Sequence, residues 1–223
     1  MKQILEYIIS KSSKRYVIKA TDDTIKQIVK NEYKRLGNNS DFNHIDVSKC
    51  TTFYMLFHSL IHSYTEYGKT VTINEFDCDV SKWNVSSVRD FSFAFSTTQF
   101  NGDLSDWDMS FAYTIDSMFN YCLKFEGKGL ENWKDRLSKL TSATYAFQKC
   151  PIKGDFLKDW QLPKLKSVQR MFSECKNLYC DLSKWSIKDI KNTDDYSQMF
   201  YGCIKMSEDL YPQHTAYQYS HMC

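Results

Sequence analysis

The residues in this sequence that could do chemistry are led by a recurring cysteine. Four cysteines each stand three residues after a phenylalanine, and zinc sites and disulfides both use cysteine. No CxxC pair occurs, however, and the equivalent positions of two earlier copies hold Leu60 and Thr98. A position that accepts leucine is an apolar packing position, so we expect free and buried thiols. The four are Cys122, Cys150, Cys175 and Cys203.

Histidine and aspartate offer two further metal candidates. His58 and His62 stand four residues apart, which on a helix would place both on one face as metal ligands, but no third ligand accompanies them at motif spacing. We therefore expect an ordinary helix extension there. An aspartate also recurs before the tryptophans, without the glycine-rich nonapeptides of calcium-binding repeats. We predict that each closes an Asx turn, and that the protein holds no metal or cofactor. These are Asp79, Asp103, Asp155 and Asp181.

Catalytic motifs are missing from the sequence. There is no GxSxG, no Walker-type GxxxxGK and no HExxH. The scattered serine, aspartate and histidine residues all have explanations within a repeated scaffold. We therefore predict that the protein is not an enzyme.

The elements that position these residues follow from a repeat. The five tryptophans are spaced 24, 26, 27 and 25 residues apart. A second phrase follows each of them, such as VSSVRDFSFAF or LSKLTSATYAF, with apolar residues at steps of three and four. Such steps favour a helical stripe. The sequence thus predicts an α/β repeat solenoid, a leucine-rich-repeat-like right-handed array of five or six turns, with short strands and one short helix per turn.

Three segments are expected along the chain. Residues 1–40 form an N-terminal capping segment, whose amphipathic helix begins at Thr21 or Asp22 and ends at Gly37. Residues 41–206 form the solenoid, with an insertion near residues 58–76. Residues 207–223, where the pattern decays, form a C-terminal cap or tail.

The repeated phrases resemble a known family. FNGDLSDWDMSFAYTIDSMFNYC, with its echoes LYCDLSKW and MFSECKNL, is similar to the BspA-like leucine-rich repeat of bacterial surface proteins and of bacterial and phage-borne proteins. The resemblance spans about residues 41–206. It implies a binding or adhesion protein, although a fold by itself specifies no activity.

Charge and hydropathy limit the partner and the compartment. The 29 Lys and Arg nearly balance the 27 Asp and Glu, so no basic footprint for nucleic acid is visible. No apolar run is long enough to span a bilayer, and Glu6 interrupts the apolar stretch at the N-terminus. We expect a cytoplasmic protein that binds neither membrane nor nucleic acid.

Aromatic residues outside the predicted core columns are the candidate binding site. We predict a non-enzymatic protein-binding scaffold that sequesters or inhibits a partner in the cytoplasm, for example as an immunity or counter-defence protein on a mobile element. A surface adhesin is the alternative, and an enzyme or a nucleic-acid binder is a weaker one. The rings could also pack sideways against the neighbouring turn, and the oligomeric state stays open. The predicted site residues are Phe93, Phe111, Tyr113, Tyr121 and Tyr145, with Tyr201 as an outlying sixth.

Overall fold

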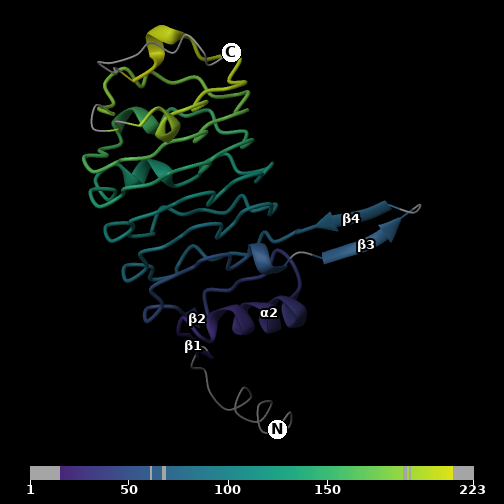
Figure 1. Ribbon diagram of the computed structural model, residues 1–223. Helices are drawn as coiled ribbons and strands as arrows, with labels where there is room; N and C mark the ends of the chain where they lie inside the picture. The colour runs from purple at the N-terminus through teal and green to yellow at the C-terminus, as the bar shows by residue number, and fades with distance from the viewer. Residues whose placement is uncertain (1–15, 61, 67–68, 188–189, 191, 213–223) are drawn as a thin grey trace, which may run out of the picture.

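The computed structural model of the protein describes residues 16–60, 62–66, 69–187, 190 and 192–212. Turns and irregular segments make up most of this part of the chain (Figure 1). The regular elements are β1 (Ile18–Lys19), α2 (Ile25–Leu36), β2 (Ile45–Asp46), β3 (His62–Glu66), β4 (Lys69–Ile73) and the 3-10 turns η1 (His58–Leu60), η2 (Leu130–Trp133), η3 (Leu157–Asp159), η4 (Thr193–Asp195) and η5 (Glu208–Leu210). No described helix is long and apolar enough to cross a membrane.

The four strands form two separate sheets. β1 pairs in parallel with β2, with Ile18 opposite Ile45. β3 and β4 form an antiparallel hairpin in which His62 lies opposite Ile73. Figure 1 shows this hairpin projecting away from the rest of the molecule. The insertion predicted near residues 58–76 therefore forms an arm.

The repeated phrase that ends in phenylalanine forms six segments, which we call layers 1 to 6. Figure 1 shows them lying one above another. Single parallel bridges join layers 1 to 5 at Thr52, Asp90, Thr114, Ser142 and Ser167. The seventh residue of each layer is the phenylalanine, and the tenth is Leu60, Thr98 or one of the four cysteines. The layers comprise residues 51–60, 89–98, 113–122, 141–150, 166–175 and 194–203.

Most backbone hydrogen bonds between layers run from one layer to the next, whereas the first residue of layers 2 to 5 donates to the preceding layer, as Arg89 N–H does to the Thr51 carbonyl. In layer 2, the N–H groups of Phe91, Phe93, Phe95 and Thr97 donate to carbonyl oxygens of layer 3 at 2.7–3.1 Å. The same four positions donate from layer 3 to layer 4, from layer 4 to layer 5 and from layer 5 to layer 6. Because these amides are used between layers, they cannot form the i→i−4 bonds of an α-helix.

Within each layer, two consecutive turns reverse the chain. In layer 2, Ala94 N–H donates to the Phe91 carbonyl and Thr98 N–H to the Phe95 carbonyl. The third residue of each turn has a positive φ, 58° at Phe93 and 61° at Thr97. A positive φ at this place is typical of type II turns, which normally use glycine. The feature recurs at the fifth position of every layer, so it belongs to the scaffold. Those residues are Met55, Phe93, Ser117, Tyr145, Arg170 and Gln198.

Replacing Ser117 by glycine should therefore stabilise the protein. Ser117 is buried with a φ of 53°. A left-handed conformation costs a non-glycine residue about 1–2 kcal/mol, and the flexibility of glycine costs about 0.5–1 kcal/mol, so Ser117→Gly should raise the free energy of unfolding by roughly 0.5–1 kcal/mol. Ser117→Val should lower it. Denaturant unfolding measures the stability of both variants. Ala146→Gly is the control, and it should destabilise the protein because φ is not positive at Ala146. A destabilising Ser117→Gly would contradict the turn assignment.

One continuous core runs through all six layers. The layer phenylalanines stack on one another, with ring centroids 5.4 Å apart for Phe95 and Phe119 and 5.5 Å apart for Phe119 and Phe147. All five tryptophans are buried in the same core. Each indole N–H also donates to a carbonyl oxygen in the preceding part of the stack at 2.8–3.2 Å, as Trp133 does to Leu104. The tryptophans therefore join neighbouring segments by packing and by hydrogen bonds.

The predicted fold class is wrong. The sequence predicted a right-handed leucine-rich-repeat-like solenoid with short strands and one short helix per turn. The described residues contain one α-helix, α2, which lies outside the layers, and their strands form only the two small sheets. The predicted helical stripe consists instead of consecutive turns, because the layer amides bond to the next layer.

Helix α2 covers the end of the stack next to layer 1. Its buried residues Ile25 and Val29 belong to the common core, and Gly37, with a φ of 80°, ends it as predicted. Asp22 does not cap the helix. Its carboxylate instead accepts hydrogen bonds from the Thr51 amide and hydroxyl, both at 2.6 Å, and so ties this end of the chain to layer 1.

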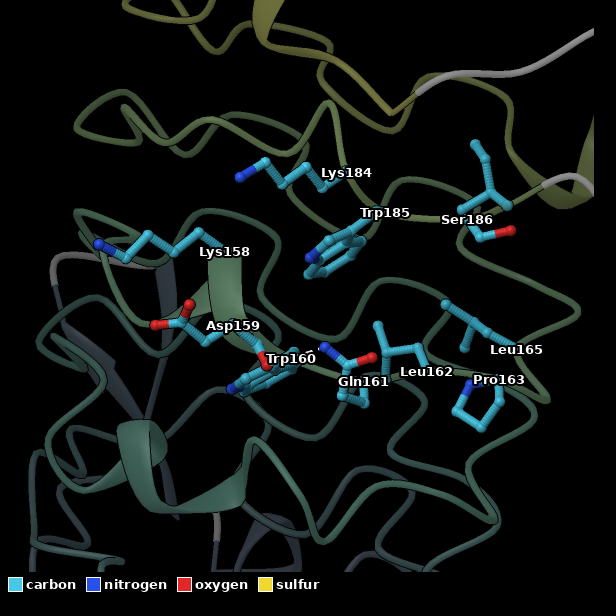
Figure 2. Close-up of a pocket in the computed structure, with 11 residues that line it drawn as sticks. Lys158, Asp159, Trp160, Gln161, Leu162, Pro163, Leu165, Lys184, Trp185 and Ser186 are labelled. Atoms are coloured by element: carbon cyan, nitrogen blue, oxygen red, sulfur yellow. Dashed lines mark hydrogen bonds between the residues drawn. The ribbon is translucent and has the colours of Figure 1, made fainter.

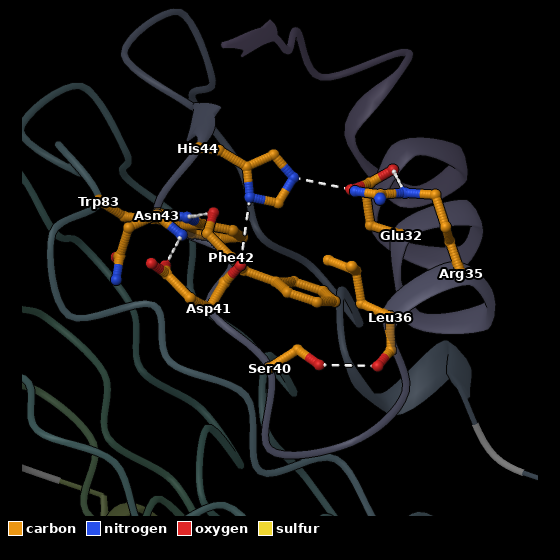
Figure 3. Close-up of polar contacts among 9 residues, drawn as sticks. All are labelled: Glu32, Arg35, Leu36, Ser40, Asp41, Phe42, Asn43, His44 and Trp83. Atoms are coloured by element: carbon orange, nitrogen blue, oxygen red, sulfur yellow. Dashed lines mark hydrogen bonds and ion pairs between the residues drawn. The ribbon is translucent and has the colours of Figure 1, made fainter. Parts of the chain in front are cut away.

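A buried carboxylate fixes the other end of α2 (Figure 3). Glu32 accepts hydrogen bonds from the Arg35 guanidinium, and His44 Nε2 lies 2.7 Å from its Oε2. These contacts lower the pKa of Glu32, and the contact with Arg35 has the largest effect, although burial opposes it.

The predicted segment boundaries at residues 40 and 206 stay predictions, and residues 1–15 and 213–223 lie outside the described part of the chain.

Candidate partner-binding surface

Four of the five predicted site residues lie at three different positions of the layers, and Phe111 lies two residues before layer 3. Phe111 and Tyr113 are each 44% exposed and Tyr121 is 41% exposed, all in or next to layer 3. Phe93 and Tyr145 occupy the fifth positions of layers 2 and 4 and are half-buried. Among the described residues, no ring contact joins any two of the five. The structure places them on neighbouring layers without forming one continuous aromatic cluster.

Most of these rings are paired with the same position of an adjacent layer. Lys139 Nζ lies 3.4 Å from the centre of the Phe111 ring, and Lys149 Nζ lies 4.5 Å from the centre of the Tyr121 ring. Arg170 lies over the Tyr145 ring at 5.8 Å. Lys149 and Arg170 come from the layer that follows that of the ring, and Lys139 stands two residues before layer 4, as Phe111 stands two residues before layer 3. The alternative that rings pack sideways thus holds in part, with a cation as the neighbour.

Sequence reasoning missed these cations and one further ring. Tyr54 in layer 1 is 46% exposed, and its ring lies 6.1 Å from that of Phe93 in an edge-to-face contact. The repeat itself carried the signal, because residues at one position of successive layers are neighbours. Aligning the copies by position would have paired Phe111 with Lys139 and Tyr145 with Arg170.

Lys149 makes the most extensive polar contacts among the cations on this surface. The pKa of Lys149 is raised by its contact with the Tyr121 hydroxyl and then by Glu174. Its Nζ also lies 3.4 Å from Glu174 Oε1. The surface therefore presents rings with cations beside them, a combination that contacts apolar and acidic groups.

The cysteines have a role that the sequence did not reveal. Cys122, Cys150, Cys175 and Cys203 are buried and free, and each S–H donates to the carbonyl oxygen of the preceding layer's phenylalanine at 2.7–2.9 Å. Burial raises the pKa of Cys122 to about 12. The thiols thus stay protonated and act as donors between layers, in addition to filling apolar positions as predicted.

Thiol reagents should therefore leave Cys122 and Cys150 unmodified in the folded protein. Only the thiolate reacts, and burial keeps the pKa of both thiols far above neutral pH. Alkylation at pH 8 followed by peptide mass spectrometry should find both residues unmodified natively and modified in denaturant. Rapid native modification of either one would show that the layers open, and a disulfide between them would contradict the cytoplasmic prediction.

The aspartates and histidines that were considered as metal ligands make hydrogen bonds to the backbone or lie in a strand. Asp79, Asp103 and Asp181 each accept a hydrogen bond from the amide two residues later at 2.9 Å, which confirms the predicted Asx turn for these three. His58 Nδ1 lies 3.0 Å from the Ser96 carbonyl oxygen, and His62 lies in β3, so the two do not share a helix face. The described residues contain no group of three metal-binding side chains.

A groove lies between the Trp160 and Trp185 segments (Figure 2). It has a volume of about 540 Å³ and is lined by the two indoles, Lys158, Lys184 and several apolar residues. The indoles are parallel within 9° at 6.4 Å, and their N–H groups already donate to backbone carbonyls. Asp159, Gln161 and Ser186 also line this groove.

Comparison with known proteins gives one match. Residues 35–154 and 138–215 match the family described as "Mycoplasma protein of unknown function, DUF285". No curated protein and no solved structure matches the chain. The family match covers most of the sequence, including every layer.

Proposed function

Since the chain belongs to the Mycoplasma family DUF285, whose function is unknown, we propose from its surface that it is a protein-binding scaffold. The observation that carries the proposal is the exposed aromatic and cationic surface of layers 3 and 4 and of the residues just before them. It holds Phe111, Tyr113 and Tyr121, together with the cations Lys139 and Lys149. Tyrosine and arginine are enriched at the energetic centres of protein interfaces, and lysine beside a ring favours an acidic neighbour.

The rigid scaffold beneath the surface supports recognition. Backbone bonds between layers and the stacked phenylalanines hold the exposed rings in a fixed geometry. A preorganised surface loses little conformational entropy when it binds. We propose that the partner is a protein that presents apolar and acidic side chains, and that binding takes place in the cytoplasm and sequesters or inhibits this partner.

The finer resemblance to BspA-like repeat proteins is part of this proposal. It rests on the repeated tryptophan and phenylalanine phrases, and it supports a binding role over a catalytic one. A surface adhesin is the alternative. Cell fractionation separates the two, because an adhesin would be found in the surface fraction.

The experiment is affinity capture with matched baits. The wild-type protein, the variant Phe111→Ala/Tyr113→Ala and the control Lys82→Ala/Asp106→Ala are immobilised and exposed to a lysate of the host cells. The control removes an exposed ion pair on the tryptophan side of the layers. A protein retained by the wild type and the control but lost with the aromatic variant supports the proposal. Equal retention by all three baits contradicts this site.

A further inference from the structure

The groove beside Trp160 and Trp185 interrupts the polar contacts that join neighbouring tryptophan segments. In the described part of the chain, no hydrogen bond or ion pair connects residues 158–163 with residues 184–187. Each earlier pair of tryptophan segments has a polar contact at the equivalent place. These contacts join Lys82 Nζ to Asp106 Oδ2 at 2.5 Å, Asn132 Nδ2 to the Ser105 carbonyl oxygen at 3.3 Å, and the Gln161 amide to the Lys134 carbonyl oxygen at 3.1 Å.

Three charged side chains stand at one end of this groove without pairing. Asp159 and Lys184 directly precede their tryptophans, as Asp106 and Lys82 do. Lys82 and Asp106 form an ion pair, whereas none joins Asp159 to Lys184 among the described residues. Lys158 is a second cation, and Figure 2 shows all three residues on the same side of the indoles. Charges of both signs are therefore available to a ligand at this end.

The other end of the groove is apolar. Leu162, Pro163 and Leu165 line it on the far side of the indoles in Figure 2. The indoles of Trp160 and Trp185 are 3% and 5% exposed, and their N–H groups already donate to backbone carbonyls. The part of the groove between its two ends thus offers apolar surface rather than hydrogen-bond donors. A volume of about 540 Å³ is large enough for a small molecule.

We propose that the groove binds a free α-amino acid with a large apolar side chain. Its ammonium group faces Asp159, and its carboxylate faces Lys158 and Lys184, so both charges of the ligand meet an opposite charge. A simple carboxylate would bring a like charge to Asp159, and a simple amine would bring one to the two lysines. The apolar side chain lies toward Leu162 and removes apolar surface from water.

This site is separate from the proposed partner-binding surface. The groove lies beside the tryptophans, whereas Phe111, Tyr113 and Tyr121 lie in or next to layer 3. The inference therefore does not depend on the proposed function, and either can fail without the other.

Titration of the full chain with L-leucine and L-phenylalanine is the first test, followed by the indole resonances of Trp160 and Trp185. Both resonances should shift and saturate with a Kd on the order of 1 mM or lower, as small ligands of this size allow, while the Trp83 resonance stays unchanged. Leucinamide, which lacks the carboxylate, and 4-methylpentanoate, which lacks the ammonium group, should each bind at least about tenfold more weakly. No saturable shift with either amino acid would overturn the proposal, and so would 4-methylpentanoate binding as tightly as L-leucine.

Charge-removing variants form the second test. Asp159→Asn and Lys184→Gln change exposed side chains, so thermal melting should stay nearly unchanged. Each should weaken L-leucine binding by at least about tenfold, and Asp159→Asn should also abolish the preference for L-leucine over 4-methylpentanoate. Lys82→Ala/Asp106→Ala, which alters the equivalent positions of another junction, is the control and should bind like the wild type. Wild-type affinity in both groove variants would show that the charges do not recognise the ligand, and the proposal would be wrong.

Discussion

Replacing Phe119 by alanine should lower the free energy of unfolding by about 3–5 kcal/mol, as truncation of a buried phenylalanine does. Phe119 is fully buried, and its ring contacts Phe95, Phe125 and Phe147 at 5.4, 3.9 and 5.5 Å between centroids. Backbone hydrogen bonds join layer 3 to layers 2 and 4, so the surrounding residues cannot readily collapse into the space that the phenyl ring leaves. The alanine variant should therefore retain a cavity. Urea unfolding measures the loss as a lower midpoint at unchanged m-value.

Tyr113→Ala is the matched control for this prediction. Tyr113 begins the same layer but is 44% exposed, so its truncation should change stability by less than about 0.5 kcal/mol. A loss below about 1 kcal/mol in Phe119→Ala would contradict a close-packed phenylalanine column. A changed m-value would indicate that unfolding had ceased to be a single transition.

Partner affinity should fall well over tenfold in the double variant Phe111→Ala/Tyr113→Ala, while thermal melting stays nearly unchanged. Aromatic residues at the centre of an interface lose about 2 kcal/mol or more each when truncated, and 1.4 kcal/mol corresponds to a factor of ten. Both side chains are exposed, and within the part of the chain that the structure describes their one ring contact is that of Phe111 with Lys139. Calorimetric titration with the captured partner gives the affinity.

The opposite side of the layers supplies the comparison. Lys82→Ala/Asp106→Ala removes an exposed ion pair beside the tryptophans and should change affinity little. If the aromatic variant binds and melts like the wild type, the site lies elsewhere, and the tryptophan side is then the next candidate. If melting loses cooperativity, the two rings support the fold, and the distinction between core and surface drawn here is wrong.

The repeat in the sequence was enough to identify the buried tryptophan and phenylalanine columns. Trp107, Trp133 and Phe119 recur at nearly constant spacing, and a spacing of this kind indicates equivalent places in successive units. The Asx turns at Asp79 and Asp103 and the end of α2 at Gly37 follow from local chemistry, because the groups that bond are only a few residues apart. The repeat also predicted the exposure of Phe111, Tyr113 and Tyr121, because these residues lie outside the core columns.

The conformation of the repeated phrase depends on contacts between layers, which the sequence does not reveal. Apolar residues at steps of three suit a helix, but they equally suit consecutive four-residue turns, because each turn returns residues such as Phe91 and Ala94 to one side. The choice depends on whether an amide such as that of Phe93 finds its acceptor in its own segment or in the next layer. That acceptor, the Asp116 carbonyl, is 23 residues away and is positioned only when the layers assemble. The cations beside Phe111 and Tyr145, and the carbonyl oxygens that accept from the cysteine thiols, are likewise distant in the sequence. They become neighbours only when the layers assemble, so the sequence did not reveal them.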